Sequence, residues 1–277
     1  MPLEHLLKHV VLAPICAAVV LLLVFRIVAR RRKLPVVVEP VLVFVIAVLV
    51  GLWSNPNWSL SLWPQSDEEW LGVGLIAAAF AEASRWIAQG WPWQLRPALA
   101  VILTWQLAVP VRDYFGWGTF AFYGMLILIA LLWSLFIVLA RDASRRLPQP
   151  AFLLVMLLQG TALALICNAS EYATAAEAAG TACSAIGILL AAHWWRPNAF
   201  DLRGLCGPWV MFLAYLSLNG RFYVDMPILS TFLVLLAPAV VFLPRPSYDR
   251  PRYHAIIAGA YALLFLLPAL WIGGVFS

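Results

Sequence analysis

The sequence predicts an all-α fold: a polytopic transmembrane helix bundle of about ten spans (8–10), built as short-looped helical hairpins. Hydrophobic residues make up 64% of the 277 residues and charged residues 11%, whereas soluble domains average roughly 45–50% and 25%. Mean hydropathy is +0.90. Because no apolar-poor stretch is long enough for a water-soluble unit, residues 1–277 are expected to form one transmembrane domain and no soluble domain.

The candidate spans follow from length. An α-helix rises 1.5 Å per residue, so about twenty residues cross a hydrocarbon core of about 30 Å. By this criterion the spans are 9–29, 35–53, 71–90, 95–111, 118–140, 150–167, 170–195, 205–220, 227–244 and 254–275. The fourth is short and the seventh is poor in large apolar residues, so eight is the lower limit.

The first three spans are set by their flanks. The run 9–29 is too long for the apolar region of a signal peptide and has its basic cluster, Arg30–Lys33, on the wrong side, so it is expected to stay as an anchor. The second span begins at a proline. The segment before the third, Ser54 to Trp70, is predicted to lie in the membrane interface because of its spaced tryptophans, Trp53, Trp58, Trp63 and Trp70.

The later spans repeat one pattern. Every connection that follows an odd-numbered span leads into the next span through a proline, and proline is favoured in the first turn of a helix. These prolines are Pro35, Pro97, Pro150, Pro208 and Pro251. The pattern predicts five helical hairpins joined by short loops.

Basic residues predict the orientation. Thirteen of the eighteen Lys and Arg residues fall in the connections after odd-numbered spans, while Lys8, Arg112 and Arg221 fall on the opposite side. By the positive-inside rule, both termini lie outside the cytoplasm, in a bacterial-type plasma membrane (the cell inner membrane). The net charge of +5 therefore reflects topology and not a nucleic-acid partner. The expected partners are the lipid bilayer and, as alternatives, other membrane subunits or a second copy of the chain.

The seventh span is unusual in composition. From Ser170 to Ala185 it has no Leu, Ile, Val, Phe, Met or Trp, yet the basic loops alternate correctly only if it crosses. On a helix its polar residues form one row, Ser170, Thr174, Glu177, Thr181 and Ser184. Small residues form an adjoining row, Ala173, Ala176, Gly180, Cys183 and Gly187. Small residues allow close helix packing in membranes, so Ala173, Ala176, Gly180 and Gly187 are predicted packing positions.

Glu177 is the main candidate for function. A carboxyl group within a membrane span is costly to ionise, and such groups mark proton or ion pathways. We therefore expect Glu177, with Thr174, Thr181 and Ser184, to line a polar pathway. The alternative is that the hydroxyls bond to their own helix and Glu177 reaches headgroup water.

Glu82 and Arg85 form a second candidate pair. They are one helical turn apart in the third span, so they are predicted to neutralise each other as one electrostatic unit. The pair is interpreted either as part of the pathway or as an ordinary interfacial ion pair. Gln106, Gln159 and Asn219 are expected to bridge helices, and Pro238 is one of the prolines expected to free helix carbonyls.

The sequence carries no motif for catalysis, metal binding or a cofactor. Its four cysteines, Cys16, Cys167, Cys183 and Cys206, lack ligand spacing. His5 and His9 are spaced i, i+4 but have no third ligand nearby, so no metal site is expected. We expect no cofactor and no catalytic residue, which disfavours an enzyme.

These observations favour a transporter-like protein that moves a small solute or ion through a polar intramembrane pathway. The alternative is a non-catalytic membrane-embedded subunit or scaffold of a larger complex. A lipid-modifying membrane enzyme is the third and least favoured hypothesis.

Overall fold

The computed structural model describes residues 4, 6–31, 38–56, 58, 64, 66–87, 92–195, 201–242 and 251–276, and these contain helices and turns but no β-strand. The elements are the π-helix η1 (Leu6–Leu12), α2 (Ala13–Arg31), α3 (Val38–Ser54), α4 (Asp67–Ile87), α5 (Pro92–Ala108), α6 (Thr119–Arg146), α7 (Gln149–Ala169), α8 (Ala173–Trp195), the 3₁₀ helix η2 (Leu202–Leu205), α9 (Cys206–Val224), α10 (Ile228–Leu236), the 3₁₀ helix η3 (Ala237–Phe242) and α11 (Pro251–Ile272). The predicted all-α class is therefore confirmed for the described residues.

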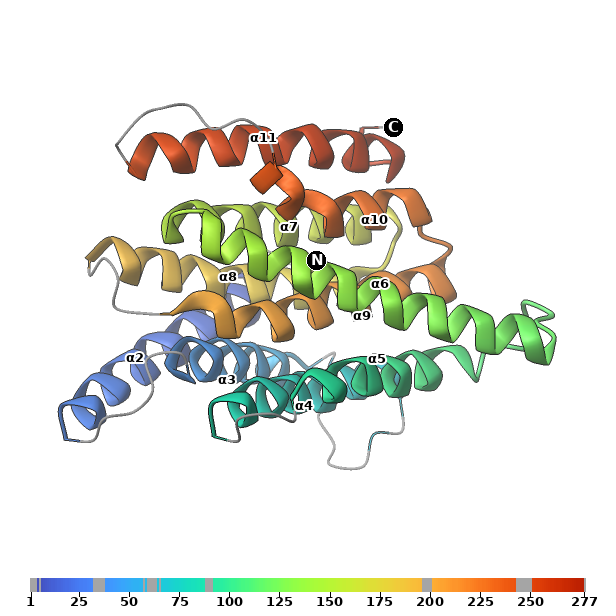
Figure 1. Cartoon of the computed structure of the whole chain (residues 1–277), viewed down its shortest axis with the longest axis horizontal. Coiled ribbons are helices and arrows are strands. Elements are labelled where there is room, and N and C mark those ends of the chain that lie inside the picture. The colour runs from blue at the N-terminus through green and yellow to red at the C-terminus, as the bar shows by residue number, and fades with distance from the viewer. Residues whose placement is uncertain are drawn as a thin grey trace.

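The helices lie side by side with their axes roughly along one direction (Figure 1). α10 and α11 lie on one side of the bundle, α2 to α5 lie on the other, and α6 to α9 lie between them. Helices that follow one another pack together, such as α2 with α3, α5 with α6, and α7 with α8. α9 is the central helix, because nearly all of its residues are buried.

Five described helices are long and apolar enough to cross a membrane. They are Leu7–Phe25, Thr119–Arg146, Gln149–Ala169, Ala173–Trp194 and His254–Ile272. Three shorter apolar helices accompany them, Glu39–Ser54, Ala98–Ala108 and Ile228–Val240. Together they indicate membrane localisation. Each of the ten predicted ranges overlaps a helix, but how many of these helices cross stays a prediction.

The outward faces of the long helices are apolar. Ile127 and Leu131 on α6, and Leu264 and Leu267 on α11, are exposed. Such faces suit helices surrounded by hydrocarbon, because a helix satisfies its backbone hydrogen bonds internally and needs no water.

The predicted flanking residues are described in part. Pro150, Pro208 and Pro251 lie in the first turns of α7, α9 and α11, whereas Pro97 lies inside α5 and Pro35 lies outside the described residues. Of the thirteen basic residues assigned to the cytoplasmic side, the side chains of Arg141, Arg145, Arg146 and Arg203 are described, and the others lie outside the described part. Trp53 is exposed, Trp58 is buried and Trp70 is half-buried, while Trp63 also lies outside it.

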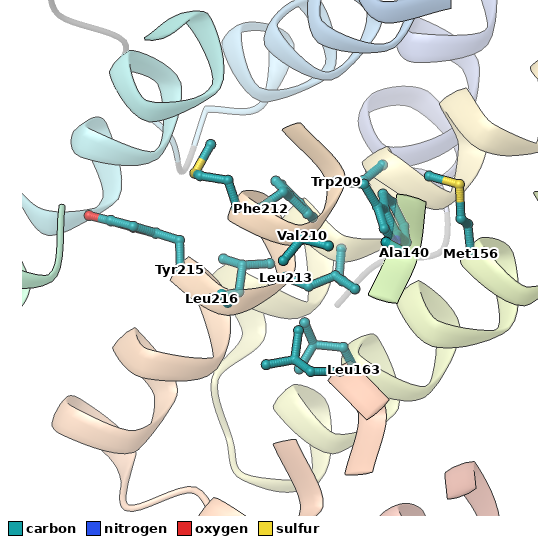
Figure 2. Close-up of a cluster of buried hydrophobic side chains, with 14 of the residues drawn as sticks. Ala140, Met156, Leu163, Trp209, Val210, Phe212, Leu213, Tyr215 and Leu216 are labelled. Carbon is teal, nitrogen blue, oxygen red and sulfur yellow. The ribbon is translucent and has the colours of Figure 1, made fainter. Parts of the chain in front are cut away.

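Aromatic side chains of α9 fill the centre of the bundle. Trp209, Phe212 and Tyr215 are buried beside Ala140 of α6 and Met156 of α7 (Figure 2). Phe44 of α3 meets Trp209 and Phe212 edge-on, with ring centroids 5.8 and 6.5 Å away. Edge-to-face contacts of this kind stabilise aromatic clusters beyond simple area burial.

α10 changes at Ala237 from an α-helix into the 3₁₀ helix η3, and Pro238 explains why. Proline has no N–H, so the carbonyl of Val234 loses the donor it would have in an α-helix. That carbonyl accepts instead from the backbone N–H of Ala237 and from Nε2 of Gln159 at 2.8 Å. Gln159 also accepts from the indole Nε1 of Trp209 at 3.1 Å, so it bridges α7, α9 and α10 as predicted.

Candidate functional site

α8, the helix poor in large apolar residues, lies inside the bundle. It packs against α7, α3, α2 and η1. Its fully buried residues include a row of alanines, Ala175, Ala178, Ala182 and Ala185. The absence of large side chains on this helix is explained by close packing, because alanine lets the neighbouring backbones approach.

The predicted packing row is less buried than this alanine row. Ala173, Ala176, Gly180 and Gly187 are all half-buried. A Cβ on Gly180 would lie 2.7 Å from Cγ1 of Val10, whereas a Cβ on Gly187 would meet nothing within 4 Å. The sequence did contain a signal for the buried row, because Leu189 continues it at helical spacing.

The polar row of α8 points into the protein over part of its length. Glu177 and Thr181 are buried, while Thr174 and Ser184 are half-buried. The Thr181 hydroxyl donates to the backbone carbonyl of Glu177 at 2.9 Å. The Ser184 hydroxyl lies 2.9 Å from the carbonyl of Val10 on η1, to which it donates. The row thus tethers η1 to α8.

Glu177 accepts a hydrogen bond from a residue that the sequence analysis did not select. Nδ2 of Asn55 donates to Oε2 of Glu177 at 2.5 Å, and both residues are buried. Asn55 follows the last residue of α3, and its own N–H donates to the carbonyl of Leu52 at 3.1 Å. Only the packing of α3 against α8 brings these two residues together, so no sequence spacing could reveal the pair.

His9 lies next to this pair. Its Nδ1 is 3.3 Å from Oγ of Ser54, the residue before Asn55. The Ser54 hydroxyl donates to the carbonyl of Gly51 at 2.9 Å. Since a serine hydroxyl has one hydrogen, His9 is the donor and Nδ1 carries a proton. We call His9, Ser54, Asn55, Glu177, Thr181 and Ser184 the Glu177 cluster.

Glu82 has a different partner from the predicted one. Nη2 of Arg141 lies 2.8 and 2.7 Å from the two carboxylate oxygens, and the side chains of Arg141 and Glu82 are 14% and 2% exposed. The carboxylate also packs on Gly207 in the first turn of α9, where any Cβ would collide with it. The side chain of Arg85 lies outside the described part of the chain.

Arg141 was missed as a partner because it was assigned to a connection. The predicted span ended at residue 140, whereas α6 continues to Arg146. This extension keeps Arg141 on the helix. Contacts of α9 with both α4 and α6 then enclose the Glu82–Arg141 pair.

The remaining candidate ligands do not gather. Among the described residues, no group of three or more His, Cys, Asp and Glu side chains is placed to hold a metal ion. Cys16, Cys167, Cys183 and Cys206 are free thiols.

The fold and the composition define a helical membrane protein with two buried carboxylates. No known protein family, no curated protein and no solved structure matches the chain. Its function is therefore inferred from its own contacts.

Proposed function

We propose that the chain is a transporter-like protein of the bacterial inner membrane, in which Glu177 takes up and releases a cation while a small solute or ion moves through a polar pathway. The observation that carries this proposal is the place of Glu177. It is 2% exposed on a helix of membrane-spanning length and composition.

The partner of Glu177 supports reversible binding. An ionised carboxylate within a bilayer is costly, and such residues usually belong to ion or proton pathways. The amide of Asn55 is neutral and donates to the carboxylate. A protonated carboxyl group still has an acceptor oxygen, so this hydrogen bond is compatible with both states of Glu177.

The pathway in this proposal follows the polar row of α8, with Thr174, Thr181 and Ser184 beside Glu177. Glu82, with Arg141 and the predicted neighbour Arg85, belongs near the opposite ends of its helices. Glu82 is close to the C-terminal end of α4 and Arg141 is close to that of α6. Glu177 is about one turn into α8, and Asn55 directly follows α3.

The proposal includes ten spans with both termini outside the cytoplasm. The common direction of the helix axes supports it (Figure 1), as does the overlap of each predicted range with a helix. Reporter fusions after Arg146 and after Phe222 test the orientation. Cytoplasmic activity is expected at Arg146 and none at Phe222, and the reverse pattern would overturn it.

Reconstitution into liposomes tests transport. Vesicles containing a pH-sensitive dye, or dyes for Na⁺ or K⁺, are expected to show cation flux with the unchanged protein and none with Glu177→Gln. Glu171→Gln is the matched control, because Glu171 is an exposed acidic residue in the turn before α8. Equal flux from Glu177→Gln and the unchanged protein would contradict the proposal.

A second candidate function, a membrane-embedded subunit or scaffold, is favoured by one observation. The polar groups around Gln159 and around Glu82 bond to one another within the chain, as a static core requires. If the liposomes show no cation flux and a carbodiimide labels Glu177 equally at every pH, this second function is the better one.

A further inference from the structure

We propose that the cation bound by the Glu177 cluster is a proton rather than a metal ion, and that His9 is the second titrating group of this site. The inference rests on the proposed function, because it names the ligand of the same carboxylate. It depends on which atoms of the cluster donate hydrogen bonds and which accept them.

The groups around Glu177 are arranged as donors. Asn55 directs its Nδ2 toward the carboxylate. The hydroxyls of Thr181 and Ser184 donate to backbone carbonyls, so those carbonyls are already engaged. Hard metal ions need several converging oxygen ligands, whereas a proton needs one basic oxygen. The described contacts therefore suit a proton.

His9 supplies a second group that changes charge under physiological conditions. Histidine is the side chain whose unperturbed titration falls between about pH 5 and pH 8. His9 contacts Ser54, and the next residue, Asn55, contacts Glu177. A charge on His9 thus acts on Glu177 across two adjacent residues of α3, in a region of low dielectric where such interactions are strong.

Few other described groups compete with His9. The elements packed against η1 are α2, α3 and α8. Their described titratable side chains are Cys16 on α2, Glu39 on α3, and Glu177, Cys183 and His193 on α8, with Cys167 on α7 behind them. Glu39 is in the first turn of α3 and His193 in the last turn of α8, at the ends away from Ser54 and Glu177. Lys8 on η1 and Glu171 before α8 are exposed.

The backbone supports this position of His9. η1 is a π-helix that contains His9 and runs into α2. π-helical turns are rare and frequently lie at functional sites. Ser184 fixes η1 against α8 through the carbonyl of Val10, so His9 is held at a constant distance from the carboxylate.

Carbodiimide labelling of Glu177, read by mass spectrometry on the full-length protein in liposomes, tests both parts. A hydrophobic carbodiimide reacts with the protonated carboxyl group, so labelling reports the proton directly. We expect labelling to fall as the pH rises from about 5 to about 9, and about 0.1 M NaCl in place of KCl to leave it unchanged.

Variants of the histidine contact test its role. His9→Gln is expected to move the midpoint of labelling upward by about one pH unit, because the ionised form of Glu177 loses a nearby positive charge. Ser54→Ala keeps the histidine but removes its contact, and is expected to give a smaller shift. His254→Gln on α11 is the control, since His254 is also half-buried, and it should give no shift.

The outcomes separate the two proposals. Protection of Glu177 by Na⁺ would show a metal-ion site, which overturns this inference but leaves the proposed function intact. An unchanged midpoint in both His9→Gln and Ser54→Ala would remove His9 from the site. Labelling that does not depend on pH or on Na⁺ would contradict the proposed function itself.

Discussion

Two buried carboxylates of this protein, Glu82 and Glu177, differ in what holds them. Both are almost fully buried, but Glu82 meets the guanidinium of Arg141 with both oxygens, whereas Glu177 accepts from the neutral amide of Asn55. A guanidinium stays charged at every accessible pH, so it fixes Glu82 in the ionised form. The comparison teaches that burial alone does not identify a working carboxylate, and that its partner must be considered too.

The two surroundings also differ in backbone regularity. Glu82 lies between the regular helices α4, α6 and α9. The Glu177 cluster lies where helices change or end: at the π-helix η1, just after α3, and one turn after the positive φ of Glu171. Irregular backbone of this kind is where membrane proteins commonly place ion sites.

The largest expected effect is on the Glu82 side of the comparison. Arg141→Gln should lower the free energy of unfolding by about 3–5 kcal/mol, because it leaves a buried carboxylate without its countercharge. Thermal and denaturant unfolding in detergent measure this effect. Glu177→Gln should cost less than about 1 kcal/mol, since an amide fits the same space.

Arg146→Gln is the matched control for Arg141→Gln. Arg146 lies on the same helix in an exposed i, i+4 pair with Asp142, which is worth about 0.3–0.5 kcal/mol. If the two arginine variants lose equal stability, the Glu82–Arg141 pair is not the fixed element we describe. A double-mutant cycle of Glu82→Gln with Arg85→Gln tests the predicted neighbour, and additivity there would exclude it.

The next effect concerns the hydrogen bonds of Gln159. Gln159→Leu should cost about 3 kcal/mol, because it leaves the Trp209 indole N–H without its acceptor and removes one donor from the Val234 carbonyl. Pro238→Ala restores a backbone N–H near that carbonyl. The cost of Gln159→Leu should therefore be smaller in the Pro238→Ala background, as unfolding of all four proteins would show. An equal cost in both backgrounds would exclude the proline as the cause.

A third effect concerns packing beside Glu177. Gly180→Leu should cost about 2 kcal/mol by overpacking against Val10, because even a Cβ would approach Cγ1 of Val10 to 2.7 Å. Gly187→Leu is the control on the same helix and should be neutral or stabilising, since glycine is a poor helix former. Melting temperatures in detergent measure both variants. Similar losses would place the close contact elsewhere on α8.

The smallest effect is a pH-dependent one at an exposed ion pair. Burial raises the pKa of Asp201, but the hydrogen bonds and charge of Arg203 outweigh it, so the pKa lies below its ordinary value of 3.8. The stabilisation is therefore present above that value and lost as the pH falls through the folded-state pKa. Asp201→Asn should cost about 0.2–1 kcal/mol at neutral pH and less under acid conditions, as unfolding at the two pH values would show. An equal cost at both would contradict the lowered pKa.

The helices were largely predictable from the sequence, and their partners were not. Length and apolar content located every described helix, and the charge of Glu177 within an alanine-rich run marked it for attention. Asn55 and Arg141 were missed because their roles depend on contacts between elements far apart in sequence. The buried alanine row of α8 was mistaken for its neighbour because alanine lies on every face of that helix.

The length of α6 has a consequence for the Glu82–Arg141 pair. α6 runs from Thr119 to Arg146, which at 1.5 Å per residue is about 42 Å, and one end projects beyond the neighbouring helices (Figure 1). A spanning helix longer than the hydrocarbon thickness tilts to match it. In a thicker bilayer α6 would stand more upright, and the load would fall on Arg141 near its far end. Lipid chain length is therefore a variable to which this ion pair responds.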